Sequence, residues 1–453
     1  MRARCAILLA FAAAACAPSV EMRPTPQVQS AERRDPAPAG AATHQPELGA
    51  ALGDPQLRRL LALAASRNVD VAVAAARIDR ARAELGIARA SMLPVVSASA
   101  GLAGTQTDNR GGSAFNFTQG FAGLDVAYDL DLFGGERAGR RGARARLAAA
   151  AFDRDAAALV AETETARAFV QYAALLDRIA LLDQNLASAR ELERIIEVRR
   201  RHGDATRVDT GLQAIQVRQL EAERLRLSEA LARTRSALAV LVGEEAPRFT
   251  LQPASLAGFS LPEIAPVQPG ELLVRRPDVR AAEARIAAAE GDVGRARAAF
   301  LPRIRLSAGA LGQAATLGGP IGATLSIGAD LLAPIFNRRR LRGDLGVAAA
   351  TQAESVELYR GALLTALAEG ESALAAVEHS RAREAVLDDM VAEAETTARL
   401  ARLQYLEGAA DLRWVLDAEQ LLIGARDARA IARQERLEAA IDLYKALGGS
   451  PRA

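Results

Sequence analysis

The pattern of apolar residues divides the chain into long helical stretches and short alternating stretches. Between residues 136 and 201 only a few early glycines interrupt the helical pattern. At 1.5 Å per residue, about 65 residues make a rod of roughly 100 Å. Apolar positions here keep a 4-3-4-3 spacing, which is typical of a coiled-coil seam: Leu175, Ile179, Leu182, Leu186 and Ala189. A return helix with leucines at heptad-compatible positions follows and ends near Leu241.

The same design occurs a second time. One helix is predicted from Arg340 to Gln404, and its return helix from Leu412 to Leu447. Gly203 and Gly408 stand at the two reversals of direction, where glycine is favoured because it adopts backbone conformations that other residues avoid. The sequence therefore predicts two helical hairpins with their tips at Gly203 and Gly408.

Four shorter stretches have the period of two that is typical of β-strands. In the second stretch every other residue from Leu124 to Leu130 is apolar, and the fourth repeats this from Ile321 to Leu331. The strands are expected within about 94–131 and 303–335, and each is about as long as a tilted barrel strand, roughly 9–11 residues. The residues alone leave two interpretations open, which are membrane strands and hairpins on a soluble protein.

An internal duplication explains the repeated design. Asn68–Pro94 aligns without a gap with Arg276–Pro302, and thirteen of the 27 pairs are identical. Asp, Gly and Pro match in register, which two unrelated alanine-rich helices would not produce. The predicted organisation is as follows: signal peptide 1–15, N-terminal strap 16–54, first repeat 55–243, linker 244–270 and second repeat 271–453.

Several landmarks recur in order along the chain: DLDLFG (Asp129–Gly134), RRPDVRAAE (Arg275–Glu283), PIFN (Pro334–Asn337) and the two glycine tips. In these residues the chain resembles TolC-type outer-membrane efflux proteins, in their NodT-like lipoprotein branch. The resemblance implies a mostly α protein with membrane β-strands, whose duplicated halves form a trimeric β-barrel continued by an α-helical coiled-coil tunnel. It also implies a passive exit duct in the outer membrane for drugs or other small molecules. A periplasmic adaptor, contacting the hairpin tips, and an inner-membrane transporter would be its partners.

The number of predicted strands also favours three copies of the chain. Four strands cannot span a membrane alone, because their edges would leave backbone groups unpaired in lipid. Two copies would give eight strands, whose side chains fill a barrel interior, whereas three give twelve and leave a lumen. The expected assembly is therefore a homotrimer in contact with outer-membrane lipid.

The N-terminus has the features of a signal peptide. Arg2 and Arg4 precede an apolar run, Ala6–Ala15, which is too short to span a bilayer. Cys16 follows, and the segment resembles a lipobox except that Ala13 stands where leucine is usual. The resemblance implies lipidation of Cys16; the alternative is cleavage at an ordinary A-x-A site that leaves the thiol free. The strap after it is rich in proline, alanine and polar residues without a sustained period, and it is expected to be extended.

Composition and isolated polar residues argue against an enzyme. The chain has 453 residues and a net charge of +2, so nothing indicates a nucleic-acid partner. His44, His202 and His379 are far apart, and no Cys/His cluster or phosphate-binding loop is recognisable, so no metal or cofactor is expected. Two alternatives to the efflux duct stay open: a lipid-tethered periplasmic coiled-coil scaffold and a type I secretion duct.

The resemblance also implies a periplasmic gate beside the second hairpin tip. Tyr405 keeps the Tyr-x-x-Gly spacing of the family, but Ala410 replaces its arginine and Trp414 one of its aspartate rings. We therefore expect Trp414 rings to close the tube by apolar contact, or else to pack against the first hairpin near Arg207 and Asp209. The full set of gate candidates is Tyr405, Asp411, Arg413, Trp414 and Asp417.

Overall fold

The computed structural model divides into two compact units, which are described separately. The sheet unit contains Met1–Gln27, Arg77–Ala151 and Ala281–Gly361, and the hairpin unit contains Val28–Ala76, Phe152–Arg280 and Ala362–Ala453. The residues described are 22–24, 47–107, 115–261, 275–314 and 319–449. Cys16 and most of the expected N-terminal strap therefore lie outside the described residues.

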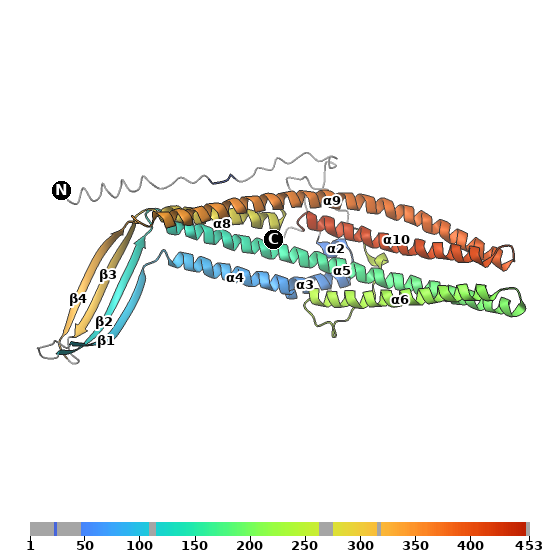
Figure 1. Ribbon diagram of the computed structural model, residues 1–453, viewed down its shortest axis with the longest axis horizontal. Coiled ribbons are helices and arrows are strands. Elements are labelled where there is room, and N and C mark those ends of the chain that lie inside the picture. The colour runs from blue at the N-terminus through green and yellow to red at the C-terminus, as the bar shows by residue number, and fades with distance from the viewer. Residues whose placement is uncertain (1–21, 25–46, 108–114, 262–274, 315–318, 450–453) are drawn as a thin grey trace. The chain divides into compact units, whose positions relative to one another are not determined.

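The elements confirm a mostly helical chain with one sheet (Figure 1). Strands occur where the alternating stretches predict them, and the two long predicted helices are each continuous. Within the described residues, no helix is both long and apolar enough to cross a membrane. The elements are α2 (Leu48–Ala51), α3 (Pro55–Arg67), α4 (Val69–Ala90), β1 (Val95–Thr107), β2 (Phe115–Leu130), α5 (Gly135–His202), α6 (Arg207–Leu241), the 3₁₀ turn η1 (Leu256–Gly258), α8 (Pro277–Ala298), β3 (Arg303–Ala314), β4 (Ile321–Leu332), α9 (Arg338–Leu406) and α10 (Leu412–Ala446).

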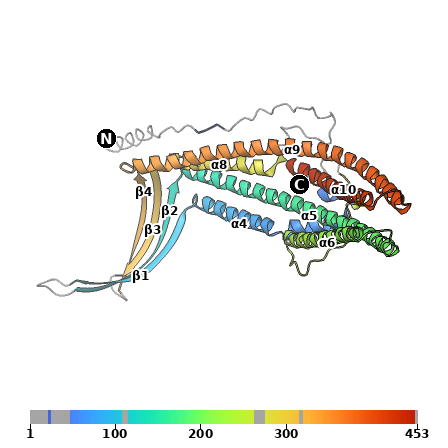
Figure 2. The same cartoon turned by 45° about the vertical axis from the view of Figure 1, so that its right-hand side comes forward.

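The sheet unit is built around an antiparallel sheet with the strand order β1-β2-β3-β4. Both figures show the four strands side by side (Figures 1 and 2). The β2–β3 ladder joins the two repeats, with Leu124 opposite Ala310. Further along the same row, Ala98 on β1 and Leu325 on β4 complete the register. Residues that are directly opposite each other point to the same face, so this register decides the composition of each face.

Glycines bring α5 and α8 close together within the sheet unit. A Cβ atom built on Gly291 would lie 2.6 Å from the Cα atom of Gly142, a distance that no side chain tolerates. Nearby, Val293, Phe300 and Leu345 form a buried apolar cluster. The close backbone approach explains why glycine is needed at Gly291, whereas a Cβ atom on Gly142 would have a tight contact of 3.1 Å with the Ala288 carbonyl oxygen.

Coiled-coil seams hold the hairpins together. Leu175, Leu182 and Leu186 on α5 pack against Val217, Leu220 and Leu227 on α6, which confirms the predicted first seam. The tip glycines have the positive φ values that the predicted turns require, +85° at Gly203 and +76° at Gly408. A capping box, in which Thr206 and Asp209 bond each other's backbone N–H groups, starts the return helix α6.

Each repeat ties the start of one helix to the end of its return helix. The Asn68 side chain accepts hydrogen bonds from the first turn of α4, and its Nδ2 donates to the Leu241 carbonyl at 2.9 Å. Arg276 is the duplicated position, and its Nη1 donates to the Ala446 carbonyl at 3.4 Å. Gly243 and Gly448 follow the two return helices with φ values of +70° and +83°. Both repeats thus make the same connection between helices, through an asparagine amide in the first repeat and an arginine guanidinium in the second.

The buried guanidinium of Arg276 also forms two ion pairs, which compensate for its removal from water. It is only 7% exposed and binds Asp278 at 2.8 Å and Glu369 of α9 at 2.7 Å. Burial would raise the pKa of Asp278, but the hydrogen bond and charge of Arg276 outweigh burial and lower that pKa. The Arg-Pro-Asp part of the sequence motif is therefore a structural junction between α8, α9 and α10.

The end of the expected strap differs from the prediction. Residues 48–51 form a short helix rather than extended chain. Leu48 and Leu52 are fully buried in a core cluster that includes Leu57 and Phe169. Two leucines four residues apart lie on one side of a helical turn, which explains why this segment folds against the core.

Candidate channel lining and periplasmic tip

One face of the sheet is apolar across all four strands. Its members belong to one set of directly paired positions: Val96, Ala98, Ala100 and Leu102 on β1, Ala122, Leu124, Val126, Tyr128 and Leu130 on β2, Ile304, Leu306, Ala308 and Ala310 on β3, and Leu325, Ile327, Ala329 and Leu331 on β4. Ile327 is 92% exposed, so no residue of the described part of the chain covers the centre of this face on β4. An exposed apolar surface of this extent fits lipid rather than water.

The opposite face carries the polar side chains. Asp125, Asp129, Arg305 and Ser326 all project from it, interspersed with glycines. Arg305 binds Asp129 through two hydrogen bonds of 2.7 and 3.1 Å, which link β2 to β3. Charged groups are costly in hydrocarbon, so this face suits an aqueous lumen.

The ion pair of Asp129 and Arg305 was not predicted from the sequence. The alternation placed Asp129 on the polar face of β2. Its partner depends on the β2–β3 register, which places Arg305 directly opposite. Arg303 and Arg305 occupy alternate positions of β3, and this was the one signal in the sequence that could have revealed the pairing.

At the second hairpin tip, Tyr405 lies inside the hairpin unit. Its side chain is 6% exposed and packs in a cluster with Leu192, Ile196 and Val415. The Arg199 guanidinium lies 4.6 Å from the centroid of the Tyr405 ring, a cation–π contact, and also donates to the Tyr405 carbonyl at 3.0 Å. Tyr405 therefore joins the two hairpin tips rather than exposing its ring.

The other gate candidates lie on the surface of the chain. Trp414 is 69% exposed, so it does not pack into the described first hairpin of its own chain. Asp417, Leu421 and Gly424 share its face of α10 at three- and four-residue spacing, and all are exposed. The structure thus separates the buried Tyr405 from an exposed stripe headed by Trp414.

Asp411 and Arg413 are the charged gate candidates next to Trp414. Asp411 occupies the N-cap position of α10 without a side-chain hydrogen bond, and Arg413 is exposed. Among the described residues, no ion pair joins the two side chains, so nothing in the single chain fixes a charge at the tip.

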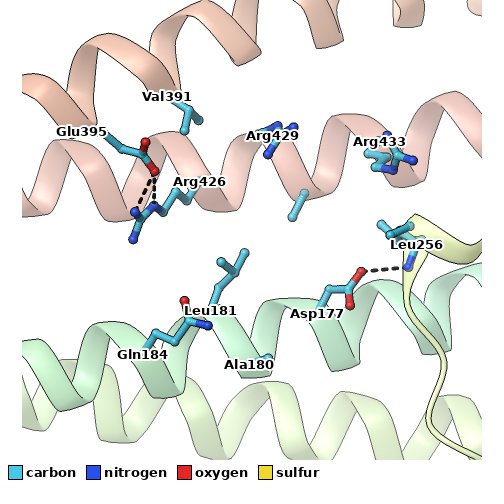
Figure 3. Close-up of a pocket in the computed structure, with 12 residues that line it drawn as sticks. Asp177, Ala180, Leu181, Gln184, Leu256, Val391, Glu395, Arg426, Arg429 and Arg433 are labelled. Atoms are coloured by element: carbon cyan, nitrogen blue, oxygen red, sulfur yellow. Dashed lines mark hydrogen bonds and ion pairs between the residues drawn. The ribbon is translucent and has the colours of Figure 1, made fainter.

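A cleft of about 640 Å³ lies higher in the hairpin unit, between α5, η1 and the second hairpin (Figure 3). Asp177 accepts a hydrogen bond from the Leu256 backbone N–H at 2.8 Å, and Glu395 pairs with Arg426 at 2.7 Å. These acidic groups are already satisfied by partners within the chain. These contacts join α5 to the linker at Leu256 and α9 to α10. The two carboxylates are therefore structural and are not placed as a free acid and base for catalysis.

A sheet with one apolar face and one polar face, attached to coiled-coil hairpins, defines a membrane channel protein. The family model described as "Outer membrane efflux protein" matches residues 60–244 and 269–449, one segment in each repeat. The chain belongs to this family, and the expectation that it is not an enzyme is confirmed because its relatives are efflux channel proteins.

Named relatives and solved structures support the same class. The chain is 34% identical to the pyoverdine export outer membrane protein OpmQ of Pseudomonas aeruginosa over 88% of this chain and 86% of that protein. It is 31% identical to the outer membrane protein OprJ of the same organism, over 98% and 95%. The outer-membrane channel OprN has a similar fold, with a TM-score of 0.88 and 28% identity over 96% and 99% of the two chains. The protein is therefore an outer-membrane efflux channel component.

Proposed function

We propose that three copies of this chain form the exit duct of a tripartite efflux pump. The single observation that carries the proposal is the sorting of the sheet into an apolar face and a polar face. In the described chain, β1 and β4 each pair on one side only, so both edges remain available to neighbours. Three copies would close these edges into twelve strands with a polar interior.

The helical hairpins supply the periplasmic part of the duct. The tips at Gly203 and Gly408 are the proposed contacts of a periplasmic adaptor, which would connect the duct to an inner-membrane transporter. The relatives are named for export of pyoverdine and for efflux of solvents and toluene. Small organic molecules are therefore the proposed cargo, released passively through the duct.

Trp414 is the proposed gate. Its 69% exposure supports the proposal that the ring approaches copies of itself around a threefold axis, with Asp417 one turn further along the same face. Tyr405 supports this site from behind, because it fixes the start of α10 against α5 through the cluster shared with Val415. Among the residues that the structure describes, no ion pair involves Asp411 or Arg413, which favours closure by apolar contact over closure by charge.

Conductance of Trp414→Ala tests the proposed function. Removal of a gating ring should raise the single-channel conductance in planar bilayers and leave the melting temperature of the trimer nearly unchanged. A loss of about 3–5 kcal/mol of stability with unchanged conductance would instead identify Trp414 as an interface residue between copies. Val240→Ala is a matched control, because Val240 is similarly exposed but lies on α6, away from the tip.

We also propose that Cys16 is lipidated. The chain belongs to an outer-membrane family, and its N-terminal sequence resembles a signal peptide followed by a lipobox, which supports this proposal. An N-terminal lipid would add membrane affinity by burying acyl chains. The lipid would support the barrel rather than replace it, because a barrel is itself a membrane anchor.

A further inference from the structure

The connection between β4 and α9 exposes large apolar side chains at the end of the membrane-facing sheet. Phe336 is 98% exposed and Ile335 is 70% exposed, and Leu332 at the end of β4 is also exposed. Side chains of this size rarely stand free in water without a partner. They continue the apolar surface of β4 beyond its last residue.

Arginines follow directly. Arg338, Arg339, Arg340 and Arg342 are exposed in the first turns of α9, and the first turn contains no acidic residue. Arg340 lies 3.8 Å from Asp344, whereas no carboxylate among the described residues pairs with the other three. We name Leu332, Ile335, Phe336 and these four arginines the junction patch.

The stability of α9 does not explain these arginines. The N-terminus of a helix carries partial positive charge, so each cation there costs about 0.3–1 kcal/mol. Most other arginines that line the hairpins bind carboxylates, as Arg178 binds Asp427. The described part of the chain therefore offers the unpaired arginines water rather than a carboxylate, which leaves them available to an anionic group from outside it.

The first repeat has the same combination at the same place. Leu132 and Phe133 are exposed just before α5, and Arg140, Arg141 and Arg144 are exposed in its first turns. The first turn of α5 differs in that it also contains Glu136, and Arg137 there binds Asp131 at 3.1 Å. Both connections still present exposed apolar side chains followed by three or more arginines that no carboxylate among the described residues binds. A single accidental cluster would not be repeated in the two halves of the duplication.

Position and charge together define the partner. The patch begins where the lipid-facing strand ends, so its apolar part lies at the edge of the hydrocarbon and its arginines at the depth of the headgroups. Arginine binds phosphate oxygens well because its guanidinium presents several donors in one plane. We propose that the junction patch binds anionic phospholipid in the periplasmic leaflet, with Ile335 and Phe336 among the acyl chains and the arginines on the phosphodiester.

Native mass spectrometry of the purified full-length protein in neutral detergent tests this binding. The protein should retain added phosphatidylglycerol in preference to phosphatidylcholine. A variant with Arg338→Gln, Arg339→Gln and Arg342→Gln should lose at least roughly tenfold of that preference, since each basic residue near an anionic surface contributes about fivefold in affinity. The matched control replaces three exposed arginines elsewhere, Arg59, Arg381 and Arg399, by glutamine and should keep the preference.

Two results would overturn the proposal. Equal retention of the two lipids by the unaltered protein would exclude recognition of the anionic headgroup, and equal loss in both triple variants would show that only net charge matters. Phe336→Ser separates lipid from a second copy of the chain as the occupant. A lipid contact predicts that Phe336→Ser weakens the retention of added phospholipid and leaves the melting temperature of the trimer in lipid-free detergent unchanged, whereas a lower melting temperature without added lipid would place Phe336 between copies.

Discussion

Ile327→Arg should prevent the sheet from inserting into a membrane. Ile327 lies near the middle of β4, on the apolar face, opposite Ala308, and is 92% exposed in the single chain. A charged residue on the lipid face near the bilayer midplane costs about 2–4 kcal/mol. Three copies share one barrel in the proposed assembly, so the trimer would lose roughly 6–12 kcal/mol, which is comparable with the whole stability of a typical domain.

The neighbouring residue provides the matched control. Ser326 belongs to the same strand and the same depth but projects from the polar face, opposite Gly309. Ser326→Arg should therefore assemble, because the added charge meets water. The assay is the amount of heat-resistant trimer in isolated outer membranes. Equal amounts for the two variants, or a loss confined to Ser326→Arg, would refute the assignment of the faces.

Three further predictions concern the connections and the N-terminus. Gly243→Ala should lower the melting temperature, because a left-handed backbone costs a residue with a side chain about 1–2 kcal/mol and the new Cβ would lie 2.4 Å from the Arg67 carbonyl oxygen. The control Gly211→Ala should leave the melting temperature unchanged, because a Cβ atom there meets open space. Arg276→Met should cost about 2–4 kcal/mol at neutral pH, below the usual range for a buried pair because both carboxylates are partly exposed. The pKa of Asp278 is lowered in the folded protein, so the stabilisation by its carboxylate is present above the unfolded pKa and is lost as pH falls through the folded value. The difference in unfolding free energy between Arg276→Met and the unaltered protein should therefore shrink in acid. A difference that stays constant with pH would contradict the ion-pair account. Cys16→Ser should remove the acyl mass from the mature N-terminus and still allow trimers, and an unmodified Cys16 in the unaltered protein would refute lipidation.

The elements of the fold could be predicted because their periodicities are local. The alternation around Leu325 and the heptad spacing around Leu182 are properties of consecutive residues, and the structure confirms both. The hairpin tips could also be predicted, because Gly203 and Gly408 each interrupt an otherwise helical pattern, and both have the positive φ values of a turn. Local pattern therefore predicted the type of the long helices and of the strands, but it missed the short helix at 48–51, whose leucine is buried by contacts with distant residues.

Partners between distant elements could not be predicted in the same way. The pairing of Arg276 with Glu369 depends on how α8 meets α9, and that of Asp129 with Arg305 on a strand register. The burial of Tyr405 depends on Arg199, which belongs to the other hairpin. Arginine and acidic residues are frequent along every helix, so composition alone allowed many pairings.

Electron cryomicroscopy of the full-length protein in lipid nanodiscs tests the central claim most directly. The account predicts three copies around one axis and a closed ring of twelve strands, with β4 of each chain hydrogen-bonded to β1 of its neighbour. Asp125, Asp129 and Ser326 should face the lumen, and Leu325 and Ile327 the lipid. A different number of copies, an open sheet edge, or an apolar face turned toward the lumen would contradict it.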